Sequence, residues 1–380
     1  MPTRAFGGRF FVPAVGTLLV AATLAVAAAV VGAQLVRPGD PVTAEVIQDG
    51  LDHPWDIVFA ADGRMLVTER VGRVRVYASI EPDAPLLSTA TVPDVRAELE
   101  SGLMGIAVEG STVYVCASRD PGGDGGAPWR VDLLRTTLAD DGSLSAFEPM
   151  AIGETVGGPR HQGCAVEIAD GHLWVTIGDA NMPDGQPLAQ GTETLNGKVL
   201  RLDLDGSVPD DNPFGNPIYS LGHRNPQGIA IRTDGLILEV EHGTDTNDEI
   251  NVIRAGGNYG YPCWTGAADV GPAPDECGPA SDYLAPAWAS GTPTLAVSGA
   301  VFLNGEAWGD WDGNLVVTTL KAEELRRFSV SADGEVTYEQ TMIDGRFGRL
   351  RAAVIGPDGA LYVSSSNGSS DRVVRVTVSD

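Results

Sequence analysis

The chain is short of positive charge, and this deficit excludes two classes of partner. Its 380 residues contain 25 lysines and arginines against 51 aspartates and glutamates, which gives a formal net charge of −26 at pH 7. Binding to nucleic acid or to an anionic membrane surface requires clustered cations. Lysine itself is almost absent, since only Lys198 and Lys321 occur. The sequence therefore predicts no nucleic-acid partner, and a lysine inside a motif merits attention.

Cysteine is also scarce, and no two cysteines stand at the spacing of a CxxC motif. The absence of this motif argues against a cysteine zinc site and against a covalently attached haem. The four cysteines that are present fit a compartment outside the cytoplasm. They allow three pairings, and we favour two of the possible bridges. One joins Cys116 and Cys164 in strand-like runs, and the other joins Cys263 and Cys277, which bracket a Gly/Pro-rich loop.

The amino terminus has the pattern of an export signal. Arg4 and Arg9 lie ahead of an uncharged apolar run over residues 10–33, which ends in the small-residue sequence VGA. Such a segment is typical of a signal peptide, and it is also long enough for an uncleaved membrane anchor. We expect residues 1–33 to be one or the other, 34–41 to be a leader, and 42–380 to be a single domain outside the cytoplasm. Membrane contact is expected only through the anchor.

The chain is rich in turn-forming residues, with 48 glycines and 25 prolines and no collagen-like period. This composition favours many short strands over helices. One pattern recurs: an apolar run, a turn such as Asp-Gly, a second apolar run and a basic third run. Its six copies begin at Trp55, Leu103, Gly163, Gln227, Ala300 and Leu350. Repeated all-β units of this size stack as blades around a central channel. The sequence therefore predicts an all-β fold, a six-bladed β-propeller; a sandwich or jelly roll does not explain the sixfold recurrence.

The densest group of polar residues surrounds the fourth copy. Its two apolar runs are joined by Asp234-Gly235, a strong hairpin signal. His223, Arg224 and Asn225 come just before the first run, and residues 241–245 come just after the second. We expect both groups to project from strand ends rather than from the core, because sites usually lie on loops of a rigid scaffold.

His161 stands in the matching place of the third copy, directly ahead of its first strand. The inner strands of a propeller start at the mouth of one channel, so His161 and Arg224 are predicted to be neighbours. An imidazole is well suited to take a proton near neutral pH. His161 is therefore the candidate general base, whereas His53 and His172 lack this context and are assigned to the surface or to packing.

Two further groups offer charge to a ligand. Lys321 follows a strand-like run of the fifth copy, and Arg349 and Arg351 open the sixth, on one side of a strand by alternation. Together these three cations are predicted to hold a polycarboxylate. The acidic run over residues 241–249 supplies the hard oxygen ligands that calcium prefers, although it does not match an EF-hand loop. A solvated acidic loop is the alternative.

Several motifs resemble the soluble quinoprotein glucose/sorbosone dehydrogenase family. Over residues 50–378 the chain carries LGHRNPQG followed by EHG, DEIN and GGNYGYP, with HQG ahead of the third copy and GRLRAAV at the sixth. The resemblance implies a six-bladed propeller that binds pyrroloquinoline quinone (PQQ) and calcium. It also implies oxidation of an aldose sugar at its anomeric hydroxyl to the lactone. The electron acceptor is not identified, because the chain has no CxxCH haem-attachment motif.

The resemblance assigns catalytic and cofactor-binding roles to individual residues. It implies that His161 takes the hydroxyl proton while a hydride passes to the quinone. Arg224 and Asn225 match residues that contact the quinone edge and stabilise negative charge there. The cations that match those bound to the cofactor's carboxylates are Lys321, Arg349 and Arg351.

The resemblance also implies two calcium sites. The backbone carbonyls of Gly243 and Thr244 match the ligands of a calcium ion at the cofactor, where it acts as a Lewis acid. Glu249 and the Tyr259 carbonyl resemble a second, structural calcium site.

Four positions depart from the family pattern. Glu100 stands where members commonly carry a glutamine that contacts the cofactor, so its carboxylate is expected at PQQ and repels it unless protonated or paired. Arg160 replaces an acidic residue beside the catalytic histidine, Thr244 replaces a proline, and Ala352 replaces an acid. These departures bear on the affinity for substrate and cofactor.

Two other functions fit the same fold. One is an extracellular propeller that binds calcium without catalysis. The other is a calcium-dependent lactone hydrolase, which requires carboxylates converging on the channel, whereas the sequence places cations there. For an oxidoreductase, we expect the loops over residues 121–129 and 264–288 to determine which sugar is bound; we call them the specificity loops.

Overall fold

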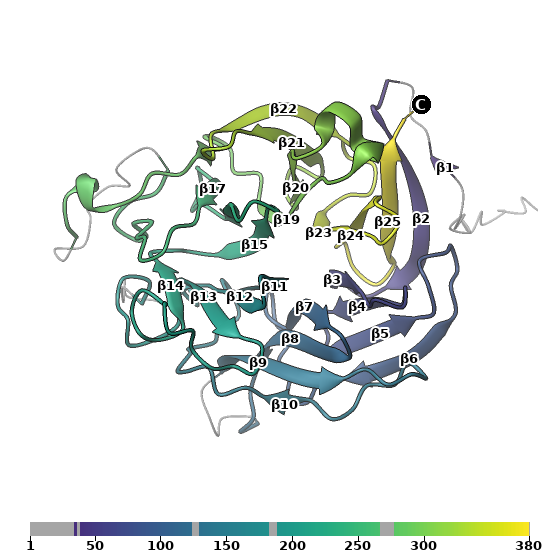
Figure 1. Cartoon of the computed structure of the whole chain (residues 1–380), viewed down its shortest axis with the longest axis horizontal. Coiled ribbons are helices and arrows are strands. Elements are labelled where there is room, and N and C mark those ends of the chain that lie inside the picture. Colours follow the sequence, from purple (N-terminus) through teal and green to yellow (C-terminus); the bar gives the residue numbers. More distant parts are fainter. Residues whose placement is uncertain (1–33, 36–38, 124–128, 182–187, 267–276, 380) are drawn as a thin grey trace, which may run out of the picture. The chain divides into compact units, whose positions relative to one another are not determined.

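Antiparallel four-stranded sheets recur along the chain, and six sheets form the blades of a β-propeller (Figure 1). The computed structural model describes residues 34–35, 39–123, 129–181, 188–266 and 277–379.

From the inner to the outer strand, blade 1 has β3 (Pro54–Phe59), β4 (Met65–Glu69), β5 (Arg73–Tyr77) and β6 (Leu86–Thr91). Blade 2 has β7 (Leu103–Glu109), β8 (Thr112–Arg119), β9 (Arg130–Thr137) and β10 (Glu148–Pro149). Blade 3 has β11 (Gly163–Ala169), β12 (His172–Ile177), β13 (Lys198–Asp203) and β14 (Ile218–Leu221), and blade 4 has β15 (Pro226–Ile231), β16 (Ile237–Glu241), β17 (Glu249–Val252) and β18 (Trp288–Ala289). Blade 5 has β19 (Val297–Phe302), β20 (Leu315–Thr319), β21 (Leu325–Val330) and β22 (Val336–Met342). The six-bladed all-β prediction is confirmed.

Blade 6 closes the ring with a strand from the other end of the domain. Its first three strands are β23 (Leu350–Ile355), β24 (Leu361–Ser365) and β25 (Asp371–Val378). The outer positions are taken by β2 (Val42–Leu51), which pairs antiparallel with β25, and by β1 (Gln34–Leu35), which pairs with β2. The alternating burial of Val42, Ala44 and Val46 explains why this segment is a strand. The sequence pattern did not predict that it completes the last blade.

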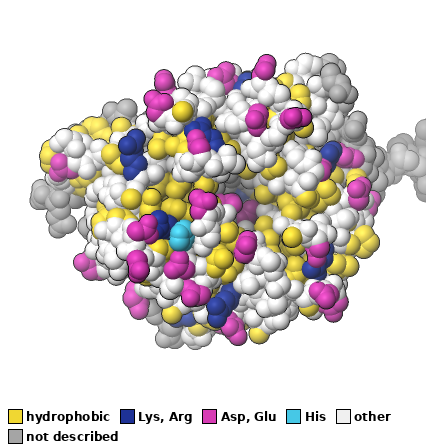
Figure 2. Space-filling model, in the orientation of Figure 1, with side chains coloured by type: hydrophobic (Ala, Val, Ile, Leu, Met, Phe, Trp, Pro, Cys, Tyr) yellow, Lys and Arg dark blue, Asp and Glu magenta, His cyan; other side chains and the backbone are white. Residues whose placement is uncertain are grey.

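The six inner strands line a central channel. Each contacts the next around the ring, and the last, β23, contacts β3. The channel encloses about 460 Å³. Figure 2 shows one face of the propeller with a hollow at its centre and acidic side chains spread around it. The buried apolar side chains gather mostly between neighbouring blades, so each blade depends on its neighbours for its core.

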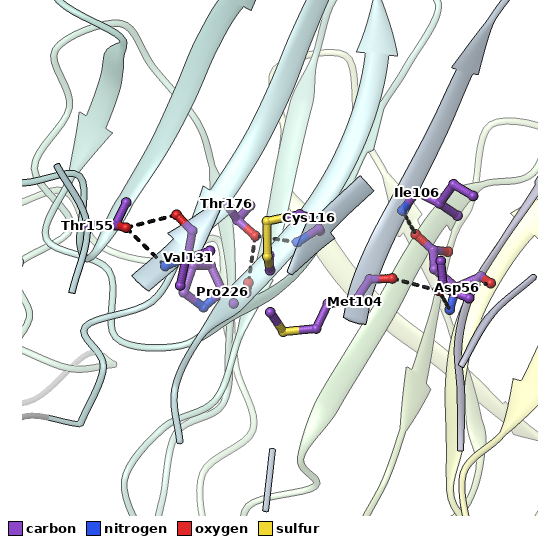
Figure 3. The surroundings of a disulfide bond; sticks show 12 residues. Asp56, Met104, Ile106, Cys116, Val131, Thr155, Thr176 and Pro226 are labelled. Carbon is purple, nitrogen blue, oxygen red and sulfur yellow. Dashed lines mark hydrogen bonds between the residues drawn. A yellow bond between two sulfur atoms is a disulfide. The ribbon is translucent and has the colours of Figure 1, made fainter. Parts of the chain in front are cut away.

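A hydroxyl group on the second strand joins four of the blades to the next one. Thr68, Thr176 and Thr318 donate to the backbone oxygens of Met104, Pro226 and Arg351, and Ser364 donates to that of Pro54. In blade 2, Cys116 occupies this place and forms a disulfide with Cys164 of blade 3, next to Thr176 and Pro226 (Figure 3). The second disulfide joins Cys263 and Cys277. Both predicted pairings are confirmed.

Glycine is required where inner strands approach one another. A Cβ on Gly228 of β15 would lie 2.3 Å from Ser298 O, and one on Gly299 of β19 would lie 2.4 Å from Arg351 O. Every inner strand also begins with a register shift of the β-bulge type. Bulges bend a strand and redirect its side chains. The repeat therefore aims the first residues of each inner strand at the channel mouth.

Helical structure is confined to two short 3-10 segments within the described part of the chain. They are η1 (Ala280–Asp282) and η2 (Glu306–Trp311). None of the described helices has the length and hydrophobicity needed to cross a membrane. The expected signal peptide or anchor over residues 1–33 lies outside the described residues, as do parts of both specificity loops.

Candidate active site

The loops that precede the inner strands of blades 3 and 4 meet through short polar contacts. His161 Nδ1 lies 2.8 Å from Asp179 Oδ1, and the Asp179 N–H donates to the Arg224 carbonyl over 2.9 Å. The Gly163 N–H donates to Asn225 Oδ1 over 3.3 Å. The structure thus brings together His161, Arg224 and Asn225, the three residues predicted to be catalytic.

The His161 ring is fixed in one orientation. The residue is 6% exposed, and its backbone is in the left-handed region with φ 55°. Asp179 Oδ1, which contacts Nδ1, also accepts the N–H of Asn181 over 2.8 Å. A carboxylate at Nδ1 favours the tautomer with a proton on that nitrogen. Nε2 is then the nitrogen that is able to accept a proton from a substrate.

Arg224 lies across the carbonyls that follow β16. Its Nη1 donates to His242 O over 3.1 Å and to Gly243 O over 2.7 Å, while its backbone N–H donates to Glu241 Oε2 over 2.6 Å. The Arg224 Nε is buried and has no hydrogen-bond partner in the residues that the structure describes. A buried donor without an acceptor is costly, so this group favours a ligand that accepts a hydrogen bond.

The two charged departures from the family pattern pair with each other. Arg160 Nη1 donates to Glu100 Oε1 over 2.9 Å. Glu100 Oε2 accepts the His161 N–H over 3.1 Å and lies 3.5 Å from Asn225 Nδ2. Burial of Glu100 opposes ionisation, but the His161 N–H and nearby positive charge lower its pKa below the usual value. The carboxylate is therefore charged and paired, which limits its repulsion of an anionic cofactor.

Arg351 lies at the floor of the mouth. It is 7% exposed, its guanidinium carbon lies 3.6 Å from the centre of the Trp55 ring, and its Nη1 donates to Gln227 Oε1 over 2.9 Å. Burial, and then the charges of Arg349 and Arg70, lower the pKa of Arg351. Cations that disfavour one another's charge in this way make a site that favours an anion.

Lys321 and Arg349 lie at the exposed edge of the same region. Lys321 Nζ lies 3.0 Å from Thr294 Oγ1, and Arg349 Nη1 donates to the carbonyl of Leu320, which precedes the lysine. Both side chains are exposed, unlike that of Arg351. The three predicted cofactor-binding cations thus comprise one buried group and two that are open to solvent.

A continuous path of hydrogen bonds connects the catalytic residues with the cations. Gln227 Nε2 donates to Asn225 Oδ1 over 2.9 Å, while Gln227 Oε1 accepts from Arg351. Gln227 and Arg351 occupy the same position in the repeats of blades 4 and 6. Across the described ranges of the chain, the buried His242 Nε2 and Arg70 Nε in this region have no hydrogen-bond partners. Positive charge and unpartnered polar atoms fit a planar polycarboxylate such as PQQ.

The predicted ligands of the cofactor calcium lie beside Arg224. Gly243 is buried and Thr244 exposed. A Cβ on Gly243 would lie 1.9 Å from Thr246 O, so only glycine allows this turn. The Gly243 carbonyl already accepts from Arg224, and a carbonyl oxygen has a second lone pair for a cation. These residues fit a calcium ion that is shared with a ligand in the mouth.

The residues of the predicted structural calcium site line one small cavity. Glu249, Tyr259 and Thr265 border a cavity of about 10 Å³, together with Gly243. This volume is enough for roughly one water molecule or ion. Thr265 Oγ1 is buried and has no hydrogen-bond partner among the described residues, and burial together with the charge of Glu241 raises the pKa of Glu249 to about 8. The carboxyl groups of Glu241 and Glu249 and the hydroxyl of Thr265 give this cavity oxygen atoms of the kind that calcium prefers, and Arg224 borders it as well.

The prediction that the His223 side chain projects away from the core is wrong. The residue is fully buried, its Nε2 lies 2.9 Å from Ser220 Oγ, and its ring stacks on Tyr259 with centroids 4.7 Å apart. Glu241 is also buried and belongs to β16 instead of the loop after it. The strand extends further than the apolar pattern suggests because β17 supplies buried polar partners, and both side chains point into blade 4.

Sequence reasoning missed Asp179, Arg70, Trp55 and Gln227. Asp179 follows the apolar run of β12 in the sequence GD, which marks a strand end but not its partner. Trp55, Gln227 and Arg351 share one position in three copies of the repeat, so an alignment of the copies is the signal that would have grouped them.

Comparisons with known proteins agree with this arrangement. The model of the glucose/sorbosone dehydrogenase family matches residues 51–375. The aldose sugar dehydrogenase of Escherichia coli (strain K12) is 33% identical over 355 residues, which cover 87% of this chain and 91% of that protein. A crystal structure of the soluble E. coli aldose sugar dehydrogenase in its apo form has a TM-score of 0.78 at 31% identity, covering 89% of this chain and 100% of that one.

A cofactor-containing structure is also similar. The PQQ-bound form of an aldose sugar dehydrogenase from Streptomyces coelicolor has a TM-score of 0.71 at 25% identity, covering 91% of this chain and 100% of that one. The family match includes the inner strands of all six blades and every predicted site residue. The chain therefore belongs to the glucose/sorbosone dehydrogenase family.

Proposed function

We propose that the protein is a PQQ- and calcium-dependent dehydrogenase that oxidises an aldose sugar at its anomeric hydroxyl to the lactone. One observation carries this proposal. A histidine whose Nδ1 is held by Asp179 lies in one polar network with Asn225, Gln227 and the buried cation Arg351. Such a network provides a base for the sugar and an anchor for an anionic cofactor.

Each of the four active-site residues has its own role in the proposed reaction. His161 accepts the proton of the anomeric hydroxyl at Nε2, and Asp179 stabilises the imidazolium that results. Arg224 and Asn225 supply donors where negative charge develops. PQQ, when bound, supplies the two-electron acceptor for the hydride of the anomeric carbon.

The proposed ligands of PQQ and calcium go one step beyond the family membership. The cations proposed to hold the carboxylates of PQQ are Arg351, Arg349 and Lys321, and Glu100, whose charge acts on Arg351, is proposed to contact the cofactor as well. The Gly243 and Thr244 carbonyls are proposed to bind one calcium ion, and Glu249 and the Tyr259 carbonyl a second. The PQQ-bound neighbour from Streptomyces coelicolor supports the choice of cofactor.

The proposed location is outside the cytoplasm. The two disulfides support this location, because structural disulfides persist in oxidising compartments. Electrons are proposed to leave through an external acceptor, since the sequence has no haem-attachment motif.

Reconstitution of the purified chain tests the proposed function. With PQQ and calcium we expect dye-linked oxidation of aldose sugars, and no activity when either is omitted. The variant His161→Ala is expected to lose activity while still binding PQQ. No oxidation across a broad panel of sugars and alcohols, despite an absorbance change on PQQ binding, would contradict the reaction.

The same experiment separates the alternatives. A calcium-binding propeller without catalysis would bind calcium and give no absorbance change with PQQ. A lactone hydrolase would release acid from lactones in the absence of PQQ. Carboxylates such as Asp56 and Glu167 do line the channel, but we favour the dehydrogenase because the buried charge next to Trp55 and Gln227 is the cation Arg351.

A further inference from the structure

Blade 4 contains a cluster of buried polar side chains behind the active-site mouth. Glu239 and Glu241 of β16 lie opposite Asn251 and Glu249 of β17 in the strand register, and His223 comes from the loop ahead of β15. His223, Glu239 and Asn251 are 0% exposed, and Glu241 is 3% exposed. The mechanism proposed above uses none of these three fully buried side chains.

The cluster has a large excess of negative charge. Three carboxylates lie within hydrogen-bonding range of a single amide: Asn251 Nδ2 is 3.1 Å from Glu239 Oε2, 3.1 Å from Glu241 Oε1 and 3.3 Å from Glu249 Oε2. Within the part of the chain that the structure describes, no lysine or arginine side chain bonds to them. Buried carboxylates without a positive partner are strongly unfavourable.

Several atoms of the cluster find no hydrogen-bond partner within the described part of the chain. They are His223 Nδ1, Glu239 Oε1 and Asn251 Oδ1, all buried. His223 Nδ1 points at the carboxylates and lies 3.6 Å from both Glu239 Oε2 and Glu241 Oε1, which is too long for a hydrogen bond. An amide nitrogen has only two hydrogens for the three carboxylate oxygens around it. The side chains therefore converge without satisfying one another.

The available ligand atoms have the separation and chemistry of a metal site. One atom each from His223, Glu239 and Glu241 lies within 4.8 Å of the others. Small side-chain rotations bring such a set to the ~2.0–2.2 Å typical of imidazole nitrogen and carboxylate oxygen around zinc. Rotation of the Asn251 amide by half a turn would present Oδ1 as a further oxygen ligand. An imidazole nitrogen favours Mn²⁺ or Zn²⁺ over Ca²⁺, which takes oxygen ligands.

We propose that His223, Glu239 and Glu241 bind one divalent transition-metal ion, Mn²⁺ or Zn²⁺, inside blade 4. This site differs from the calcium positions at Gly243 and at Glu249, because it uses a ring nitrogen and the carboxylates of Glu239 and Glu241, although Glu241 also borders the cavity beside Glu249. The ion neutralises the buried charge and holds Glu241, whose Oε2 accepts the Arg224 N–H. Through Glu241 the ion thereby helps to fix the position of Arg224. The proposed metal site does not depend on which substrate the protein oxidises.

Protons are the competing source of positive charge. Burial and the charge of Glu241 raise the pKa of Glu239 well above its usual value. A protonated Glu239 would keep the cluster neutral without metal. The two accounts differ in what happens when Glu239 becomes an amide, because Glu239→Gln mimics the protonated acid but is a poor metal ligand.

The metal content and the thermal stability of the full chain distinguish metal binding from protonation of Glu239. The protein is stripped with a chelator, given Ca²⁺ to fill the calcium sites, and then dialysed against MnCl₂ or ZnCl₂. We expect about one equivalent of Mn²⁺ or Zn²⁺ per chain by elemental analysis and a rise in melting temperature. Glu239→Gln should weaken this binding about tenfold or more and remove the rise. The control Glu324→Gln changes a buried carboxylate paired with Arg326 in blade 5 and should retain the ion.

Three results would overturn the proposal. One is the absence of any bound ion besides calcium, and another is equal metal content in wild type and Glu239→Gln. The third is a Glu239→Gln variant that melts higher than wild type in every metal-containing buffer. If Glu239→Gln fails to fold, zinc-edge X-ray absorption of the wild type replaces it. Imidazole scattering is then expected, and an oxygen-only shell would contradict the site.

Discussion

Asp179 is the residue on which the proposed base depends. Its Oδ1 holds His161 Nδ1 at 2.8 Å, so Asp179→Asn offers an amide that no longer favours the tautomer with Nε2 free. We expect kcat for sugar oxidation to fall about 100-fold or more, with a smaller change in KM. Steady-state kinetics across a pH series measure this loss, and the pH profile should shift because the base itself is altered.

A second aspartate–histidine pair provides the control for Asp179. His172 Nδ1 lies 3.1 Å from Asp203 Oδ1 between β12 and β13, at the end of β12 opposite to Asp179. Asp203→Asn should leave kcat and its pH profile unchanged. Equal activities of Asp179→Asn and Asp203→Asn would show that His161 is not the base.

The Glu100–Arg160 ion pair makes a prediction about cofactor affinity. Arg160→Ala leaves the Glu100 carboxylate without its cationic partner, next to the proposed position of an anionic cofactor. Because Arg160 is half exposed, we expect a modest effect, about tenfold weaker PQQ binding. Glu100→Gln combined with Arg160→Ala should restore the affinity, as measured by PQQ titration of absorbance. Equal dissociation constants for wild type and both variants would show that Glu100 does not face the cofactor.

At the scale of the strand, the Cys116–Cys164 disulfide replaces a hydroxyl contact. Thr68, Thr176 and Thr318 join their blades to the next through a hydrogen bond at the equivalent place. The variant Cys116→Ala/Cys164→Ala should lose about 2–5 kcal/mol of the free energy of unfolding, measured by denaturant titration. Cys116→Thr/Cys164→Ala should lose about 1 kcal/mol less, because a threonine restores the hydrogen bond. Identical losses would mean that blade 2 does not share the arrangement of the others.

Two inner strands carry acids that make stability depend on pH. Desolvation inside the channel raises the pKa of Asp56 on β3 to about 7, and desolvation together with the charge of Asp56 raises the pKa of Glu167 on β11 to about 7, although part of the Glu167 side chain is open to the channel. The folded chain therefore retains protons that the unfolded chain releases above its lower, ordinary pKa values. The associated stability is present at low pH and is lost as the pH rises through about 7.

Melting temperatures between pH 5 and pH 9 test this dependence. Wild type should become less stable across the window, whereas Glu167→Gln, which cannot ionise, should show a flatter curve. Parallel curves for the two proteins would show that Glu167 is already ionised in the channel at pH 5.

A comparison of predicted and observed strands shows how much of the fold can be predicted from a single sequence. The first strands of all six blades begin within three residues of the predicted starts, because apolar runs and Asp-Gly turns are local signals. The inward direction of His223 is not local. It depends on Glu239 and Glu241 of the neighbouring strand and on Tyr259 beyond it. Contacts of this kind arise from packing between segments, so the sequence pattern placed the residue but not its side chain.

At the scale of the whole molecule, the ring brings distant residues together. His161, Asn225 and Arg351 come from blades 3, 4 and 6, yet Asn225 and Gln227 connect them at the channel mouth. The repeat predicts this convergence, since equivalent positions of every blade face one axis. The role of β2 was not predictable in the same way. Its alternation shows a strand, but only closure of the ring makes β25 its partner.

The central claim is that one cavity at the channel mouth holds PQQ between the histidine and the cations. A crystal structure of the full chain with PQQ and Ca²⁺ measures this most directly. We predict planar density with a carboxylate at Arg351, its quinone edge at Arg224 and Asn225, and His161 Nε2 facing the space for the sugar. PQQ density elsewhere, or saturating PQQ without density at the mouth, would contradict the account.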